Sequence, residues 1–276
     1  MTASDQQRPQ VADLAGFRLG RRVAAYREED AILYALAVGA RAQELELLYE
    51  RELRVLPTYA LALGLWAVEA AGASGAYDPL RTLHVGQRLD VRKPLPRSGE
   101  VEMEAHVAAV FDKGSAALLE VAVSSPVFDA IYDIWIPGAG GFGGERGASA
   151  RQAPTGDPEL GLTLETSPQQ AALYRLTGDR HPLHIDPEIA SEAGFERPIL
   201  HGLCLLGAAS LALARGLGEE PTSISQLAAR FAAPVYPGTE VALAVWRGPA
   251  GDASFSARAG EAEVLKEGRI SFAAAG

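Results

Sequence analysis

The sequence is short of cysteine: Cys204 is the only one in 276 residues. A single thiol cannot close a disulfide within the chain, and it excludes zinc sites that are built from several cysteines. Such sparse cysteine is typical of a reducing compartment, so we expect a cytoplasmic protein. Because Cys204 falls inside an apolar segment, where a thiol is usually unreactive, a cysteine nucleophile is not expected.

Long hydrophobic runs are also missing. The longest uncharged apolar stretch covers residues 203–214, well short of the roughly 20 residues that a membrane-spanning helix needs. The first twenty residues contain no apolar core of a signal peptide, and the last five, FAAAG, match no peroxisomal or ER-retention tail. These features predict a protein that is neither exported nor inserted into a membrane.

Basic residues are outnumbered by acidic ones. The chain has 25 lysines and arginines against 35 aspartates and glutamates, a formal net charge of −10. An acidic chain is not attracted nonspecifically to nucleic acid or to an anionic bilayer, so neither is expected as a partner. Apolar residues are present in the proportion usual for globular proteins, 48%, which predicts folded domains and not disorder.

A pattern of prolines and strand starts is repeated along the chain. Pro57 precedes one uncharged apolar segment, and Pro198 precedes another 141 positions later. Three further residues recur with an offset of 140: Pro94, Glu100 and Val101, as Pro234, Glu240 and Val241. Because 140 is about half the chain length, we predict two copies of one fold.

Each copy places an apolar helix before a group of strands. Residues 57–71 and 201–215 are apolar on nearly every side, which is typical of helices enclosed by a sheet. Strand-like apolar runs follow them, at 101–107, 117–123 and 130–136 in the first copy and at 241–246, 254–259 and 269–272 in the second. An antiparallel sheet wrapped around one central helix is the hotdog arrangement. The predicted fold is therefore an α+β double hotdog.

The two copies are separated by a stretch rich in glycine and proline, which we predict to be a linker over residues 137–160. The first hotdog then covers residues 1–136 and the second residues 161–276. Gly138, Gly140 and Gly143 match the G-x-G-x-x-G spacing, but no apolar helix follows them and no βαβ context surrounds them. A dinucleotide-binding loop is therefore not expected.

Three of the five histidines fall within residues 181–201, where the chain also carries clear helix signals. Asp186 has the position of an N-cap, Pro187 that of the first helical residue, and Gly194 that of a C-terminal glycine. These signals predict a short helix over residues 187–193.

A candidate catalytic cluster surrounds this short helix. Asp179 and His184 lie just before it on a loop, where side chains are positioned by loop geometry. After it, His201 and Gly202 begin the second apolar helix, whose first N–H groups can stabilise an oxygen that becomes negative during a reaction. A carboxylate, an imidazole and an oxyanion donor are thus close in sequence.

The run from Tyr174 to His184, YRLTGDRHPLH, resembles the hydratase 2 motif Gly-Asp-x-Asn-Pro-Leu-His of the MaoC-like (R)-specific enoyl-CoA hydratases. Further matches are Pro198–Cys204, Arg230–Phe231, Pro234–Gly238, Gly140–Gly144 and Asp112–Gly114. The resemblance covers most of the chain. It implies a double hotdog that acts on 2-enoyl-CoA thioesters, usually as a homodimer.

The resemblance also implies a degenerate first copy that widens the acyl site. The positions 140 before Asp179 and His184 hold Gly39 and Glu44, so the first copy lacks the acid and the histidine. We expect the first copy to bind the acyl chain and to supply no catalytic residue.

The reaction implied by the resemblance is the reversible hydration of trans-2-enoyl-CoA to (3R)-3-hydroxyacyl-CoA. Asp179 is expected to take a proton from the water that adds to C3, and His184 to hold that water and deliver a proton at C2. The N–H of Gly202 is expected to stabilise the thioester oxygen. No metal or redox cofactor is needed, and Lys113 and Arg230 are the predicted partners of the CoA phosphates.

One residue departs from the motif: His181 stands where the family has asparagine. A neutral imidazole has one donor and one acceptor, so it can partly replace the amide, and we expect His181 to take part in the site. A metal site is another interpretation of this cluster, because its side chains are of types that bind metal ions: His181, His184, Asp186 and His201. Pro182 interrupts the regular helical face that such a site would need, so metal is not expected.

Two alternatives to hydration stay open. A hotdog acyl-CoA thioesterase also uses an acid and helix N–H groups, and it would release free CoA thiol. An acyl-CoA-binding or partner subunit that has lost turnover through the change at His181 would bind the ligand without forming either product.

Overall fold

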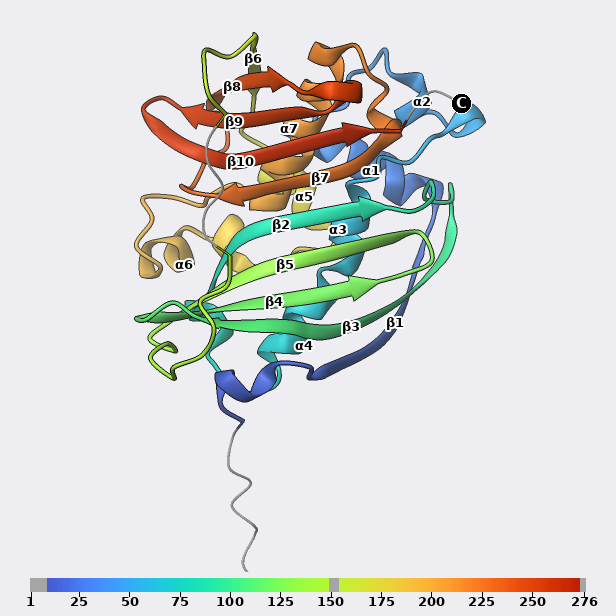
Figure 1. Ribbon diagram of the computed structural model, residues 1–276. Helices are drawn as coiled ribbons and strands as arrows, with labels where there is room; N and C mark the ends of the chain where they lie inside the picture. Colours follow the sequence, from blue (N-terminus) through green and yellow to red (C-terminus); the bar gives the residue numbers. More distant parts are fainter. Residues whose placement is uncertain (1–8, 149–153, 274–276) are drawn as a thin grey trace, which may run out of the picture.

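The computed structural model describes residues 9–148 and 154–273. Its ten strands form one antiparallel sheet in the order β1-β3-β4-β5-β2-β7-β10-β9-β8-β6, with the helices on one face (Figure 1). The strands are β1 (Arg18–Tyr26), β2 (Leu83–Val91), β3 (Gly99–Asp112), β4 (Ala116–Ser124), β5 (Phe128–Pro137), β6 (Leu160–Glu165), β7 (Ile224–Phe231), β8 (Glu240–Arg247), β9 (Ala253–Ala259) and β10 (Ala262–Phe272).

The helices are α1 (Glu28–Ala37), α2 (Leu45–Leu48), α3 (Tyr59–Gly64), α4 (Trp66–Gly72), α5 (Gln170–Tyr174), α6 (Pro187–Glu192) and α7 (Gly202–Leu217). Short 3₁₀ turns are η1 (Val11–Leu14), η2 (Glu50–Glu52), η3 (Pro79–Arg81), η4 (Arg175–Thr177), η5 (Pro182–His184), η6 (Pro221–Ser223) and η7 (Pro249–Gly251). Among the described residues, no helix combines the length and apolar character needed to cross a bilayer.

The strand order confirms the duplication. The first five strands are arranged as β1-β3-β4-β5-β2, and the last five repeat that order from the opposite edge as β6-β8-β9-β10-β7. The two halves meet where β2 pairs with β7, from Gly86 opposite Arg230 to Asp90 opposite Gln226. The double hotdog is therefore one continuous sheet.

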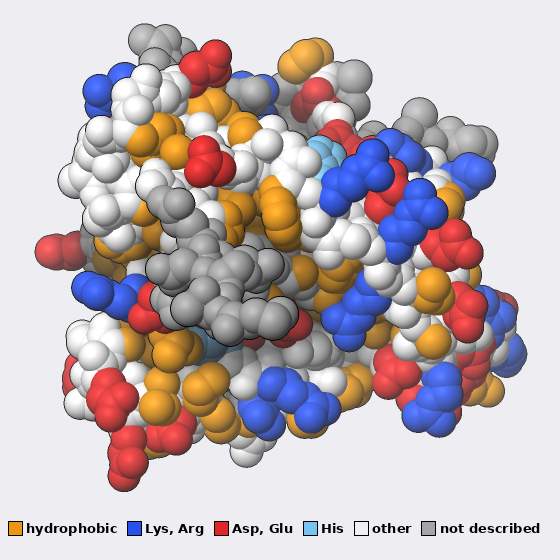
Figure 2. Space-filling model, turned by 90° about the horizontal axis from the view of Figure 1, so that it is seen from below, with side chains coloured by type: hydrophobic (Ala, Val, Ile, Leu, Met, Phe, Trp, Pro, Cys, Tyr) orange, Lys and Arg blue, Asp and Glu red, His pale blue; other side chains and the backbone are white. Residues whose placement is uncertain are grey.

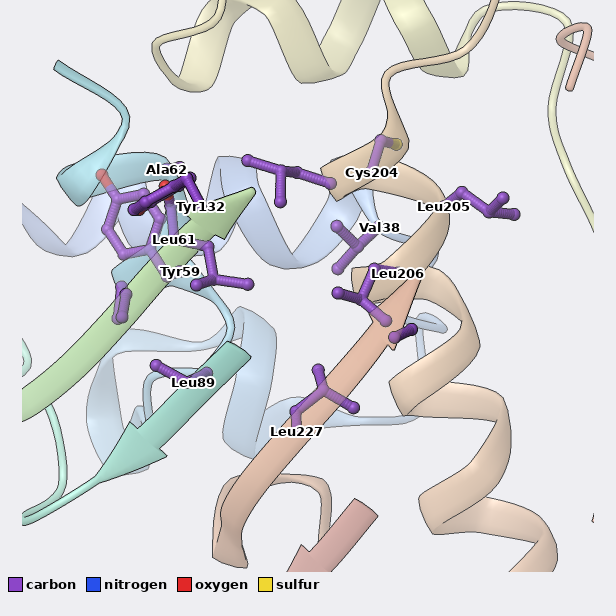
Figure 3. Close-up of a cluster of buried hydrophobic side chains, with 14 of the residues drawn as sticks. Val38, Tyr59, Leu61, Ala62, Leu89, Tyr132, Cys204, Leu205, Leu206 and Leu227 are labelled. Carbon is purple, nitrogen blue, oxygen red and sulfur yellow. The ribbon is translucent and has the colours of Figure 1, made fainter. Parts of the chain in front are cut away.

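One core serves both halves. Figure 3 shows side chains from the helices and the central strands converging on a single buried cluster. Leu61 of α3, Leu89 of β2 and Tyr132 of β5 come from the first half. Leu206 of α7 and Leu227 of β7 come from the second half, and all five side chains are almost completely buried. The halves are therefore packed as one hydrophobic unit.

The two central helices differ. The second is continuous as α7, whereas the helix predicted over residues 57–71 is interrupted at Leu65 between α3 and α4, so the prediction of one unbroken helix was wrong. The hydroxyl of Tyr132 donates a 2.8 Å hydrogen bond to the Leu61 carbonyl. In a regular helix the N–H of Leu65 would donate to that carbonyl. It donates instead to the Ala62 carbonyl, at 3.4 Å. A side chain of the sheet thus interrupts the helix.

The region predicted to be a linker has β5 before it and β6 after it, and residues 149–153 within it lie outside the described residues. The N–H groups of Gly141 and Gly143 donate to the Asp112 carboxylate at 2.9 and 2.7 Å. Together with Gly114 these backbone donors hold the pKa of Asp112 down at about 2. The glycine-rich run is therefore fastened to the β3–β4 turn.

Candidate active site

The catalytic loop, residues 175–184, is shaped by local backbone interactions. After η4, Gly178 takes φ +142°, a conformation that L side chains rarely adopt. Asp179 follows, and its Oδ1 accepts a 3.2 Å hydrogen bond from the N–H of His181. This turn holds the Asp179 carboxylate, which is partly exposed, at the head of η5.

His181 is the N-cap of η5. Its Nδ1 accepts a 3.2 Å hydrogen bond from the N–H of Leu183, as the side-chain oxygen of an asparagine could. Because Nδ1 is an acceptor here, the ring proton of the neutral imidazole is on Nε2. The replacement of asparagine by histidine in the motif therefore keeps the cap.

His184 is held with one ring nitrogen free. Its Nδ1 lies 2.8 Å from the Ile199 carbonyl, to which it donates, so Nε2 is left as an acceptor. Burial lowers the pKa of His184, while the Asp179 carboxylate and the Ile199 carbonyl oppose that shift. A largely neutral imidazole beside a carboxylate can accept a hydrogen bond or a proton from a water molecule between them.

His201 connects the catalytic loop to α7. Its ring stacks on His184 with centroids 3.7 Å apart and an interplanar angle of 27°. Its Nε2 donates to the Asp179 carbonyl at 3.2 Å, and only 1% of the residue is exposed. Burial, reinforced by His184, lowers the pKa of His201 to about 2. His201 therefore stays neutral and holds the two candidate catalytic residues in place, a role that the sequence did not assign to it.

The same three residues are poorly arranged for a metal ion, although their ligand atoms lie within 4.8 Å of one another. The rings of His184 and His201 stack 3.7 Å apart with their planes 27° from parallel, so an ion close to the plane of one ring lies well out of the plane of the other, where that ring has no lone pair.

Gly202 is the first residue of α7, where helix geometry leaves N–H groups without partners inside the helix. The ring of Phe231 lies against it, so a Cβ at this position would be 3.2 Å from two ring atoms. The hydrogen bond from His201 to Asp179 brings this end of α7 next to the carboxylate. The acid, the imidazole and the candidate oxyanion donor are therefore together in space as well as in sequence.

The structure does not bring the two predicted CoA cations to this cluster. Lys113 lies in the β3–β4 turn, where its ammonium contacts the Arg146 carbonyl. Arg230 pairs with Glu267 at 3.4 Å. Since Phe231 faces the helices, its neighbour Arg230 points to the opposite face of the sheet. Their roles toward CoA remain predictions.

A cavity of about 410 Å³ borders the catalytic loop. Thr177 and Gly178 form its edge at the loop, next to Asp179, and its other walls come from helices α1, α3 and α4 and strand β1 of the first half. Its lining combines apolar side chains, among them Tyr59, Ala62 and Trp66, with the charged side chains Arg22, Asp30 and Glu69. The cavity is therefore placed to receive a group that extends from the carboxylate into the first half.

Comparisons with known proteins identify both halves separately. Residues 25–129 match the family model described as the MFE-2 hydratase 2 N-terminal domain, and residues 149–268 match the MaoC like domain.

Curated relatives match most of the chain. It is 35% identical over 272 residues to 3-hydroxyacyl-thioester dehydratase Y of Mycobacterium tuberculosis, covering 90% of this chain and 93% of that protein. It is 38% identical over 235 residues to enoyl-CoA hydratase ChsH3 of the same organism, covering 79% of this chain and 82% of the relative. Against the peroxisomal multifunctional enzyme type 2 of Mus musculus the identity is 36% over 251 residues, and the match spans only 34% of that longer protein.

A solved structure has the same fold. The MaoC-like dehydratase from Phytophthora capsici superposes with a TM-score of 0.85 at 30% identity, covering 95% of this chain and 97% of that one.

Proposed function

The chain belongs to the hydratase 2 group of the MaoC-like dehydratases, and we propose that it catalyses the reversible hydration of a trans-2-enoyl-CoA to the (3R)-3-hydroxyacyl-CoA. One observation carries the proposal to this particular chain. Asp179 and the free Nε2 of His184 lie together at the start of α7, held there by His201.

Asp179 and His184 act on the water that adds to C3. Asp179 is the general base, and the unprotonated Nε2 of His184 holds the water in line with the substrate. As the oxygen of water bonds to C3, one of its protons passes to the Asp179–His184 pair. The pair returns a proton to C2, so the site ends the reaction in its starting protonation state.

The N–H of Gly202 acts on the other end of the reacting system. Addition at C3 moves electrons onto the thioester oxygen, and an N–H already aimed at that oxygen stabilises the enolate without rearrangement. A donor of this kind is worth roughly two to three orders of magnitude in rate.

The acyl chain extends into the cavity beside Gly178. Its walls of Tyr59, Ala62 and Trp66 belong to the first half, which thereby contributes the acyl site. For the CoA phosphates, Arg180 and Arg197 are better placed than Lys113 and Arg230. Arg180 is exposed on the catalytic loop, and Arg197 is exposed on the segment that leads into α7.

The decisive experiment incubates the purified protein with crotonyl-CoA and with longer trans-2-enoyl-CoA esters. The proposal expects loss of the enoyl absorbance and a (3R) product. Release of free CoA thiol would instead identify a thioesterase, and tight binding without any product would identify a binding subunit.

Assembly and compartment complete the proposal. We propose a homodimer, on the family resemblance, and a cytoplasmic location, on the scarcity of cysteine. The hydratase 2 relative from Arabidopsis thaliana is named peroxisomal, which makes a peroxisome-type location the competing outcome. Light scattering after size exclusion tests the dimer, and cell fractionation tests the compartment.

A further inference from the structure

Strand β2 of the first half contains a bulge that turns one side chain toward the active site. His84 is opposite Ile134 of β5, but Gly86 is opposite Asp133, so Val85 has no partner in the register. In a regular strand residues 84 and 86 would face the same side. The bulge places His84 on the side of buried Ile134, facing the helices, while Gly86 faces Asp133 on the outer side.

The His84 ring is fixed in this position by its own bulge. Its Nε2 lies 2.9 Å from the Gly86 carbonyl, to which the neutral ring donates. Its ring centroid is 5.7 Å from that of Tyr132 and 5.0 Å from that of Phe231, which it meets edge-on at 74°. Burial among these rings lowers the pKa of His84 to about 4, and the charge of Asp179 opposes the shift. A neutral His84 therefore lies within electrostatic reach of the catalytic carboxylate.

Phe231 connects His84 to the candidate oxyanion donor. It ends β7, the strand that pairs with β2 at the centre of the sheet (Figure 1). One side of the Phe231 ring packs so closely on Gly202 that an added Cβ would be 3.2 to 3.3 Å from three ring atoms. Contacts thus run from His84 in the first half, through Phe231, to the first residue of α7.

We propose that His84 is a positioning residue for the hydration reaction. By packing edge-on with Phe231, it holds that ring against Gly202 and so fixes the N–H of Gly202 relative to Asp179. The proposal rests on the hydration function and adds to it, since the first half then supports the transition state in addition to binding the acyl chain. The bulge in β2 is the device that makes this possible.

The test compares His84→Ala, His84→Phe and His84→Gln with the native enzyme on one enoyl-CoA substrate. Misplacing an oxyanion donor affects the transition state more than the bound substrate, so His84→Ala is expected to lower kcat about tenfold or more while KM changes less than about twofold. His84→Phe keeps the ring that contacts Phe231 and is expected to recover most of the lost kcat. His84→Gln keeps a donor but no ring and is expected to recover little.

A matched control and a double variant separate positioning from general damage. His106→Ala removes an exposed histidine from β3 and is expected to leave kcat and KM unchanged. Circular dichroism and thermal melting identify any variant that fails to fold. If His84 acts through Phe231, the kcat of the double variant His84→Ala/Phe231→Leu is expected to match that of the more damaged single variant.

Three results would overturn the proposal: native kcat in folded His84→Ala, recovery by His84→Gln but not by His84→Phe, or multiplicative losses in the double variant. If the native protein hydrates enoyl-CoA and His84→Ala does so equally well, the proposed role of His84 is wrong but the hydration function stands. If the native protein has no hydratase activity, the proposed function is wrong and the role of His84 falls with it.

Discussion

Each histidine at the site has one ring nitrogen hydrogen-bonded to the backbone. These hydrogen bonds decide which ring nitrogen carries the proton. His184 donates to the Ile199 carbonyl, His201 to the Asp179 carbonyl and His84 to the Gly86 carbonyl. His181 differs, since it accepts from the N–H of Leu183. Backbone groups thus select the tautomer of each ring and leave Nε2 of His184 as the acceptor beside Asp179.

Loss of either proton-handling group should nearly abolish turnover. Asp179→Asn removes the base, and His184→Ala removes the group that holds the water, so each is expected to lower kcat by about two orders of magnitude or more. Steady-state kinetics on crotonyl-CoA, with circular dichroism to verify folding, measures the effect. Near-native turnover in folded Asp179→Asn would rule out the proposed mechanism.

His181 should make activity sensitive to acid. Protonation of its ring at Nδ1 removes the acceptor for the Leu183 N–H and so breaks the cap that shapes the loop next to Asp179. Activity is therefore expected to fall toward acidic pH. His181→Asn, whose amide oxygen accepts at any pH, is expected to flatten that fall and keep the rate at neutral pH. Loss of activity in His181→Asn at all pH values would instead make His181 a catalytic group.

His201 should make stability depend on pH. Its folded pKa of about 2 is far below the roughly 6.5 of an unfolded histidine. Below about pH 6.5 the unfolded chain binds a proton that the folded protein does not, so the free energy of unfolding should drop by up to about 1.4 kcal/mol per pH unit from this residue.

Urea unfolding at several pH values between neutral and mildly acidic measures this dependence. His201→Gln is expected to be less stable overall, because it loses the stacking on His184, but also to show a shallower decline with falling pH. An equal decline in both proteins would contradict the assignment of the effect to His201.

At the scale of elements, the interruption between α3 and α4 separates residues that face different surroundings. Ala62 lines the cavity beside the catalytic loop, whereas a Cβ at Gly64 would lie 2.5 Å from the Tyr132 hydroxyl. The hydroxyl of Tyr132 is also the group that takes the Leu61 carbonyl out of the helix. The same short helix therefore faces the cavity beside the catalytic loop on one side and the sheet on the other.

Substitutions at these two positions should have opposite consequences. Ala62→Trp fills the cavity and is expected to keep the fold while shifting preference toward shorter acyl chains. Gly64→Leu overlaps Tyr132 and is expected to lower the melting temperature. A series of kcat/KM values over enoyl-CoA chain lengths, with thermal melting, measures both. If the chain-length preference of Ala62→Trp is unchanged, this cavity does not bind the acyl chain.

At the scale of the whole molecule, the two hotdogs are joined by backbone pairing and by a common core. Strands β2 and β7 pair along five positions, and side chains of both halves fill the cluster of Figure 3. The surface is mixed in charge: on the face shown in Figure 2, basic side chains lie beside acidic ones. On this face, therefore, no extended patch of basic side chains alone is visible.

The halves should not fold separately. Cutting between residues 148 and 154 exposes the edges of β2 and β7 and the core surface around Leu89 and Leu227. Each half expressed alone is expected to aggregate, and the two expressed together are expected to recover soluble, active protein. Size exclusion and activity of the separate and combined halves measure this. A soluble, cooperatively folding second half would show that its core is sufficient.

The sequence by itself determined the features that local patterns encode. The repeat of about 140 residues, the six predicted strands and the helix α6 follow from periodicity, proline and glycine, and the structure confirms them. The proximity of Asp179, His184 and Gly202 was also accessible, because one loop and one helix start carry them. Strands β1, β2, β6 and β7 were not predicted. The sequences of β1, β2 and β7 show no clear alternation, so their neighbours in the sheet decide their conformation, whereas β6 does alternate but begins at the end of the segment interpreted as a linker.

The tertiary structure alone decided the contacts between residues far apart in the chain. Tyr132 reaches the Leu61 carbonyl across 71 positions and interrupts a helix whose own sequence predicts continuity. The bulge at Val85 and the packing of His84 on Phe231 depend on three strands meeting. The periodicity of a sequence indicates which positions are buried. It does not indicate which residues from distant parts of the chain will contact them. The orientation of the catalytic atoms depends on those distant groups, and so only the folded chain determines it.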